Sequence, residues 1–267
     1  RPGILCGHGV IVSGAEEALL HFATKTQTPV ASTLLGLGAF PASHPLALGM
    51  MGMHGEAHTN LAIQNSDLIL AFGMRFDDRV TGNLKTYAPK AKKIHVEIDP
   101  SEVHKNVHVD LPLVGDLKNV VSDLVPMVDE YDHDEWLNEI NGWKSEADER
   151  SIMNWPEDGK LYVAHLVHDL WKATGGGAII TTDVGQHQMW TAQYYALEKP
   201  NRWITSGGSG TMGFGLPSAI GAWFANKDQE IWAIAGGGGF QMTAAELTTA
   251  VQEGANVKVA IMNNNFL

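Results

Sequence analysis

The residues of this sequence that could do chemistry gather near its end, in the stretch AIAGGGGFQMTAAELTTAVQEGANVKVAIMNNN, residues 233–265. Four consecutive glycines, 236–239, stand between an apolar run and a helical pattern. Glycine lets backbone amides approach a phosphate closely, and the positive end of the following helix favours the anion. The next apolar run ends in Asn263, Asn264 and Asn265, whose amide oxygens could ligate a hard divalent cation. The stretch predicts a strand, a glycine turn, a helix and a strand that hold a phosphorylated ligand; a flexible turn and a hydrogen-bonded strand end are the alternatives.

Two earlier segments also place unusual residues directly after apolar, strand-like runs: VGQHQMW, residues 184–190, and GGSGTMGFG, residues 207–215. In an open parallel sheet, ligands bind beyond the carboxyl ends of the strands. Gln186 and His187 follow the run AIITTDVG, so they are candidates for such a site rather than for a core position. Met212 is either core filling or an apolar wedge under a ligand ring. Together with the glycine turn, these segments predict one ligand site at one edge of a sheet.

The rest of the chain predicts the sheets that must position these segments. Short β-rich runs alternate with helical stretches, and the runs cover residues 4–10, 29–33, 67–73, 92–99 and 111–116. Strands that lack in-out alternation and are separated by helices indicate a parallel sheet covered on both faces. A second unit of this kind begins with the amphipathic pattern LYVAHLVHDLWKA. The sequence predicts an α/β protein with two doubly wound parallel-sheet units.

The domain boundaries follow from a change in composition. Residues 129–159 are acidic, tryptophan-bearing and poor in β-branched residues. We interpret them as a linker that contains one helix, with its tryptophans packed on a neighbour. The predicted domains are therefore residues 1–128 and 160–267.

Composition and charge exclude several classes of protein. The 267 residues, 44% of them hydrophobic, suffice for two packed domains. A net charge of −12, from 18 basic and 30 acidic residues, repels nucleic acids and anionic membrane surfaces. The single cysteine, Cys6, excludes an internal disulfide framework, and no apolar run approaches the roughly 20 residues that span a bilayer. We expect a cytoplasmic protein, with an organelle as the alternative in a plant or fungal source. Both ends of the sequence interrupt predicted strands, so we expect it to be a fragment of a longer protein.

Several long motifs in the second half occur in a consistent order: TTDVGQHQMW, SGGSGTMGFGLPSAIGAW, GGGGFQM with ELTTAVQEG, and AIMNNN. Together they resemble the thiamine-diphosphate enzymes, and specifically the acetohydroxyacid synthase (acetolactate synthase) catalytic subunit. MGMHG, AFGMRFDDRVTG and HVEIDPSE in the first half are similar to the central domain of that family. The resemblance implies a central FAD-binding domain, followed by the first part of a domain that binds thiamine diphosphate and magnesium.

The resemblance also implies which residues contact each cofactor. For thiamine diphosphate, the matching positions are Val184, Gly185, Gln186, His187, Gly210, Met212, Gly238 and Gly239. For FAD, they are Thr33, Leu34, Met53, His54, Gly73, Arg75, Asp78, Arg79, Glu97, Ile98 and Asp116. Arginine and aspartate near glycine turns suit a dinucleotide that carries a diphosphate and hydroxyl groups; a solvated charged turn is the alternative for FDDRV.

The magnesium site departs from the family pattern. The resemblance implies Asn264 and the backbone of Phe266 as ligands, together with an aspartate at the position that Gly237 occupies here. Position 264 lies 27 residues beyond position 237, as the family pattern requires, so misalignment does not account for the glycine. Loss of an anionic oxygen should weaken metal and cofactor binding. A natural inactive or weakened paralogue, a deliberate or accidental substitution, and a sequencing error are all open explanations.

The implied activity is decarboxylation of pyruvate and condensation with a second 2-oxoacid, pyruvate or 2-oxobutyrate, in branched-chain amino-acid biosynthesis. The family implies a homodimer or tetramer with a small regulatory subunit. Its activating glutamate belongs to an N-terminal domain that this sequence does not contain, so no catalytic residue is expected here. The alternatives are another thiamine-diphosphate enzyme, such as a pyruvate oxidase, a glyoxylate carboligase or a 2-oxoacid decarboxylase, and a non-catalytic degenerate paralogue. A nicotinamide-binding fold is disfavoured because GHGVIVSG is an imperfect fingerprint.

Overall fold

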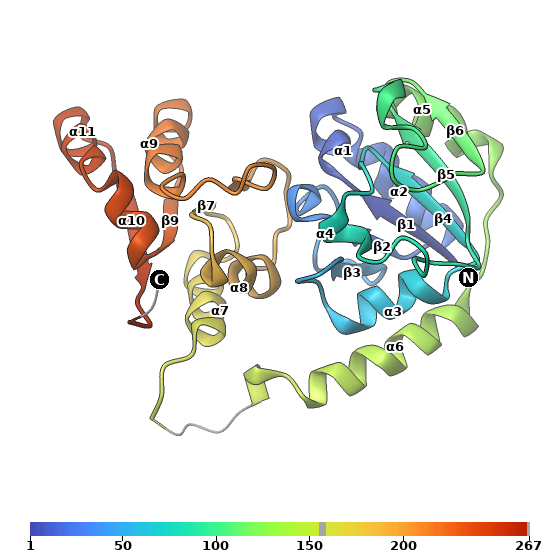
Figure 1. The fold of residues 1–267 in the computed structure, drawn as a ribbon, viewed down its shortest axis with the longest axis horizontal. Coiled ribbons are helices and arrows are strands. Elements are labelled where there is room, and N and C mark those ends of the chain that lie inside the picture. Colours follow the sequence, from blue (N-terminus) through green and yellow to red (C-terminus); the bar gives the residue numbers. More distant parts are fainter. Residues whose placement is uncertain (155–158, 266–267) are drawn as a thin grey trace. The chain divides into compact units, whose positions relative to one another are not determined.

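The computed structural model describes residues 1–154 and 159–265, which form two compact units divided after Asn154 (Figure 1). Each unit contains one parallel sheet with helices packed on it. The predicted fold class, two doubly wound α/β units, is therefore confirmed. No helix of the described ranges is long and apolar enough to cross a membrane.

The first unit is built on a six-stranded sheet with the order β3-β2-β1-β4-β5-β6. All five neighbouring pairs are parallel. The strands are β1 (Pro2–Cys6), β2 (Val30–Ser32), β3 (Ala47–Met50), β4 (Leu68–Phe72), β5 (Lys92–Glu97) and β6 (Leu111–Val114). The chain proceeds outward from β1 in one direction and from β4 in the other, so the switch point of the sheet lies between these two strands.

Helices cover both faces of this sheet. They are α1 (His8–Ser13), α2 (Glu16–Thr26), α3 (Ala57–Asn65), α4 (Asp78–Thr81), α5 (Leu117–Leu124) and α6 (Asp134–Glu149), with 3-10 turns η1 (Leu34–Gly36), η2 (Pro100–Glu102), η3 (Val125–Met127) and η4 (Ile152–Asn154). Ile4 and Cys6 point into a core shared with α1, α2 and α5, whereas Leu5 points into a second core shared with α3 and α6. Burial of alternate residues on opposite faces makes these strands apolar throughout.

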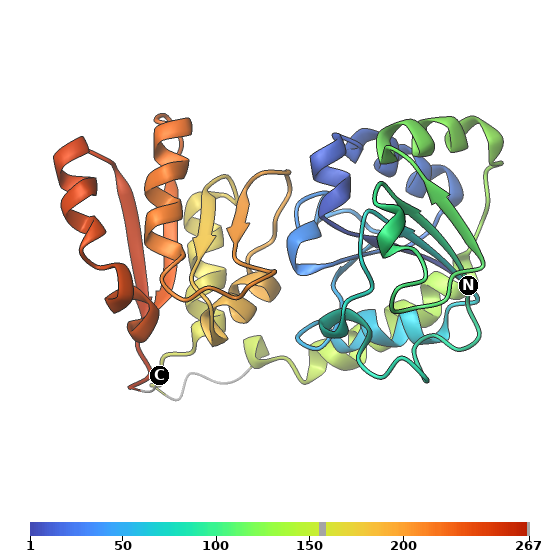
Figure 2. The same cartoon turned by 45° about the horizontal axis from the view of Figure 1, so that its top comes forward.

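Helix α6 comes from the segment that the sequence analysis assigned to a linker. It packs against α3, as Figure 2 also shows. Trp136 is buried and donates a hydrogen bond from Nε1 to the carbonyl oxygen of Pro2 at 3.0 Å. The expectation of one helix whose tryptophans pack on a neighbour therefore corresponds to α6 on the first unit.

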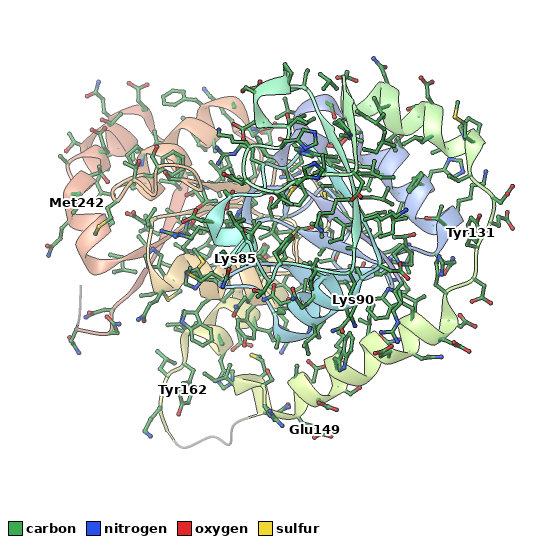
Figure 3. The ribbon with its side chains drawn as sticks, turned by 45° about the vertical axis from the view of Figure 1, so that its right-hand side comes forward. Lys85, Lys90, Tyr131, Glu149, Tyr162 and Met242 are labelled. Atoms are coloured by element: carbon green, nitrogen blue, oxygen red, sulfur yellow. The ribbon has the colours of Figure 1, made fainter. Side chains whose placement is uncertain are left out.

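The second unit has a four-stranded parallel sheet with the order β10-β9-β7-β8. Its strands are β7 (Ile179–Thr182), β8 (Trp203–Thr205), β9 (Ile231–Gly236) and β10 (Val257–Met262). The helices are α7 (Val163–Thr174), α8 (Gln186–Tyr194), α9 (Gly215–Ala225), α10 (Gly237–Thr243) and α11 (Glu246–Glu253). Helix α9 packs on one face of β7 and β9, with α10 and α11 beside it, and α8 lies on the other face (Figures 1 and 2). The exposed Met242 marks the outer surface of α10 in Figure 3.

Two local predictions were wrong. The run 4–10 was expected to be extended, but β1 ends at Cys6 and α1 begins at His8, which lets Val10 enter the core. The four glycines were expected to form a turn, but Gly236 caps α10 and the next three glycines form its first helical turn. For α1, burial of Val10 outweighs the low helix propensity of glycine. In α10 the buried residue is Gly239 itself.

Candidate functional site

The candidate site lies where β7 and β9 end. The chain proceeds from β7 to β8 on one side and from β9 to β10 on the other, so the switch point of this sheet is between β7 and β9. Strand β7 leads into Asp183, Val184 and Gly185 before α8 begins, and β9 leads directly into α10. Two of the segments predicted from the sequence therefore meet at this edge.

Strand β10 brings the asparagines to the same edge. Met262 pairs with Gly236 in the parallel ladder, so Asn263 follows beside the start of α10. The side chain of Asn263 accepts a hydrogen bond from the backbone N–H of Asn265 at 2.9 Å, which turns the chain at the end of the strand. Asn264 lies in this turn and is exposed.

His187 connects the ends of β7 and β9. Its side chain is buried, and a Cβ added to Gly185 or Gly236 would lie 2.9 Å or 3.1 Å from its Cε1 atom. The ring thus occupies space that exists only because both neighbours are glycines. Gly185 also has a φ of +153°, a conformation that side chains rarely adopt.

The environment of His187 favours the neutral imidazole. Burial lowers the pKa of His187, and the nearby Asp183 carboxylate and backbone partly oppose this effect. Within the described residues, Nε2 has no hydrogen-bond partner although it is buried. A buried polar atom without a partner costs free energy, so this nitrogen keeps an unused capacity for a hydrogen bond.

The turn at residues 210–213 completes the site. A Cβ on Gly210 would lie 3.9 Å from Cγ1 of Val184, so this turn reaches the end of β7. The carbonyl oxygen of Gly213 accepts a hydrogen bond from Oγ1 of Thr243 in α10 at 3.0 Å. Met212 is 42% exposed, so it is not core filling. All three predicted segments are therefore brought together.

The arrangement fits a diphosphate better than it fits a cation. The first turn of α10 presents backbone N–H groups at the edge where His187 leaves Nε2 unpaired. A Cβ on Gly237 would meet nothing within 4 Å, so this position has room for a side chain and lacks one. Among residues 1–154 and 159–265, no three His, Cys, Asp or Glu side chains are grouped to hold a metal. Asn264 offers only a neutral oxygen, and Phe266 lies outside the described residues.

The candidate FAD residues lie along the carboxyl edge of the six-stranded sheet. They lie after β2 (Thr33, Leu34), after β3 (Met53, His54), after β4 and in the adjoining α4 (Gly73, Arg75, Asp78, Arg79), at the end of β5 (Glu97, Ile98) and after β6 (Asp116). Met53 and Ile98 expose 61% and 69% of their surface, which leaves apolar groups available at this edge. Residues from five strands thus share the side of the sheet that binds ligands in such folds.

Several of these side chains already have local structural roles. The side chain of Thr33 accepts a hydrogen bond from the backbone N–H of Gly36. The side chain of Asp116 accepts one from the backbone N–H of Asn119 at the start of α5. One carboxylate oxygen of the buried Glu97 accepts from the N–H groups of Ile98 and Asp99. Asp78 pairs with Arg79 at 2.7 Å. Helix caps and turns therefore account for Thr33, Asp116 and Glu97 without a ligand.

Two residues at these sites were missed by sequence reasoning. Asp183 is 1% exposed and contacts both glycine segments of the second unit. Asn60 clamps the loop that carries Met53, since its amide accepts from the N–H of Gly52 and donates to the oxygen of Gly52, both at 2.9 Å. The position of Asp183 after the apolar run AIITT was the available signal, whereas nothing in the sequence pairs Asn60 with Gly52.

Comparison with known proteins identifies the class. The family model described as the thiamine pyrophosphate enzyme, central domain, matches residues 1–124. The model described as the thiamine pyrophosphate enzyme, C-terminal TPP binding domain, matches residues 183–267. The chain belongs to the thiamine pyrophosphate enzymes.

Within this family, the chain is similar over its whole length to acetolactate synthases. It is 46% identical to the acetolactate synthase of Mycobacterium leprae, 42% to the acetolactate synthase large subunit of Haemophilus influenzae and 40% to the acetolactate synthase isozyme 3 large subunit of Escherichia coli. The alignments cover 100% of this chain but only 43% to 47% of those proteins. The predicted resemblance and the thiamine diphosphate-binding domain are confirmed.

Proposed function

We propose that the chain is part of an acetolactate synthase large subunit, which decarboxylates pyruvate and condenses the product with a second 2-oxoacid. One observation carries the proposal: His187 and the glycines at the ends of β7 and β9 form a single cradle at the switch point of the sheet. This cradle lies in the region that matches a TPP binding domain. Similarity to acetolactate synthases over the whole chain supports the choice of activity.

In this proposal the first turn of α10 holds the diphosphate of the cofactor. Gly238 and Gly239 approach it through their backbones, and a helix N-terminus favours the negative charge. Val184, Gly185, Gln186 and His187 line one side, whereas Gly210 and Met212 lie against the thiamine. Bound thiamine diphosphate supplies an electron sink for decarboxylation, and the residues of this chain orient it.

Magnesium and FAD belong to the same proposal. Asn264 and the backbone of Phe266 would hold the cation, with Gly237 at the position where the family uses aspartate. This set has a single fixed neutral side-chain ligand, so we expect weak cation binding. FAD would lie along the carboxyl edge of the first sheet, with its diphosphate near Arg75 and Arg79 and its other parts against Met53 and Ile98.

The proposed partners follow from the relatives. The proteins of Haemophilus influenzae and Escherichia coli are named large subunits, which supports a small regulatory partner for this chain. We further propose a homodimer or tetramer, with pyruvate and 2-oxobutyrate as substrates. Gly237 favours a second candidate, a paralogue that keeps the fold without catalysis.

Acetolactate formation by the full-length protein tests this proposal. Pyruvate is supplied with magnesium, thiamine diphosphate and FAD, and acetolactate is compared with peroxide and free aldehyde as products. Acetolactate from the Gly237 form or from Gly237→Asp supports the synthase. Peroxide or free aldehyde as the main product indicates a different thiamine-diphosphate enzyme. If neither form turns over pyruvate even with all cofactors supplied, the protein is the non-catalytic paralogue.

A further inference from the structure

A buried carboxylate, Asp183, joins the three segments of the candidate site. We propose that Asp183 is a positioning residue for thiamine diphosphate, which fixes the turn at residues 210–213, and with it Met212, against the end of β7 and the first turn of α10. This inference rests on the proposed function of the site. Asp183 acts through its neighbours and need not touch the cofactor.

The hydrogen bonds of Asp183 hold two segments. Its Oδ1 accepts from the backbone N–H of Val184 at 2.7 Å and from that of Gly213 at 2.9 Å, and its Oδ2 lies 3.1 Å from the same Gly213 nitrogen. The backbone N–H of Asp183 donates to the carbonyl oxygen of Ile234 in β9 at 2.9 Å. A carboxylate that accepts several N–H bonds is held firmly in a buried site.

The third segment packs directly on this carboxylate. A Cβ on Gly239 would lie 2.4 Å from Oδ2 of Asp183, so the absence of a side chain in α10 makes room for the carboxylate. Thr243, one turn further along α10, donates to the carbonyl oxygen of Gly213. Gly213 is therefore held through its N–H by Asp183 and through its oxygen by Thr243.

The turn at residues 210–213 depends on its hydrogen bond to Asp183 because its glycine backbone can adopt many other conformations. Gly210 and Gly213 have φ angles of +62° and +85°, in the region that glycine reaches without strain. Such a turn has many alternative conformations when it is released. Without the carboxylate, the buried N–H of Gly213 would lose its acceptor, which favours rearrangement of the turn and of Met212.

A purely structural role for Asp183 is the competing explanation, and a control variant separates the two. Oγ1 of Thr205, also buried in this unit, lies 2.6 Å from Oγ1 of Thr182 and accepts from Nε2 of Gln188 at 2.7 Å. Thr205→Val removes buried hydrogen bonds of the same sheet without touching the turn. It should lower stability as Asp183→Ala does.

The test is calorimetric titration of the chain with two probes in the presence of magnesium: thiamine diphosphate and inorganic diphosphate. Asp183→Ala should weaken thiamine diphosphate binding about tenfold or more, since a buried hydrogen-bond donor is left unpaired. Inorganic diphosphate, which needs only the first turn of α10, should lose much less affinity. The affinity of Asp183→Asn for thiamine diphosphate should lie between those of the unaltered chain and Asp183→Ala, because one side-chain oxygen can still accept a hydrogen bond from Gly213. Thr205→Val should leave both affinities unchanged.

Two results would overturn the inference. In the first, Asp183→Ala binds thiamine diphosphate as tightly as the unaltered chain does. In the second, Asp183→Ala and Thr205→Val both lose affinity for the two probes, and by the same factor. Failure of the proposed function has a different signature. In that case neither the unaltered chain nor its Gly237→Asp form takes up thiamine diphosphate, and the inference falls with it.

Discussion

The two units use glycine at their switch points for opposite purposes. In the first unit, a Cβ on Gly7 would lie 2.2 Å from the carbonyl oxygen of Gly73, so the glycines let two loops of the protein touch. In the second unit, the glycines make room for the His187 ring and the Asp183 carboxylate, and Gly237 faces open space. Glycines at equivalent places in two parallel sheets thus bring two loops together in one unit, and in the other they leave room for side chains and open space beside the strand ends.

The largest effect should come from breaking the loop contact of the first unit. Gly7→Ala places a methyl group against backbone that cannot move aside, so we expect a loss of about 3 kcal/mol in the free energy of unfolding. Hydrogen exchange of the backbone amides in β1 and β4 measures this loss of stability within the first unit. Gly142→Ala in α6 is the control, since its Cβ meets nothing within 4 Å and alanine favours the helix. Equal protection in both variants would show that the loops are not packed as described.

Within the second unit, neighbouring glycines should behave differently. Gly239→Ala forces a methyl group against the anchored Asp183 carboxylate and should cost about 2 kcal/mol. Gly237→Ala has free space, so its free energy of unfolding should change by less than about 0.5 kcal/mol. Urea unfolding followed by circular dichroism measures both. The same cost at both positions would contradict the contrast between a packed and an open glycine.

Helix caps of the first unit should contribute less than its loop contact. Asp116→Ala removes the acceptor for the N–H of Asn119 at the start of α5, and we expect a loss of about 1 kcal/mol. Asp116→Asn keeps an acceptor and is the matched control. If FAD affinity falls in the alanine variant while stability stays unchanged, the side chain serves the flavin rather than the helix.

A separate effect concerns pH. Burial raises the pKa of Glu56 to about 7, which the charge of Lys144 partly offsets and that of Asp148 reinforces. His58, whose own pKa burial lowers, lies 3.3 Å from the carboxylate. The folded state therefore binds a proton at Glu56 that the unfolded state releases, and this contribution to stability is lost as pH rises from about 4.5 to about 7.

Glu56→Gln should remove that part of the pH dependence and stabilise the chain above pH 7. Urea unfolding of both forms across this range measures the difference, in which the other titrating groups cancel. Parallel curves at all pH values would show that the carboxylate is hydrated in the folded chain.

Much of the fold was predictable because its signals are local. Apolar runs without alternation indicated parallel strands, and AIMNNN correctly placed the end of β10. The start of α10 was not predictable, because glycine has low helix propensity and only packing over Asp183 makes Gly237 to Gly239 helical. The site segments could be listed from sequence, but their convergence on Asp183 depends on the order of the strands, which no single segment encodes.

The most direct test of the account is magnesium-dependent binding of thiamine diphosphate to the Gly237 form and to Gly237→Asp. A Cβ at this position meets nothing within 4 Å, so a side chain can start there, and an anionic oxygen ligand strengthens a magnesium site. We predict that calorimetry shows about tenfold or more tighter binding for Gly237→Asp with magnesium, and little change for Gly237→Asn. Identical binding curves for the Gly237 and aspartate forms would contradict the assignment of this edge as the diphosphate and magnesium site.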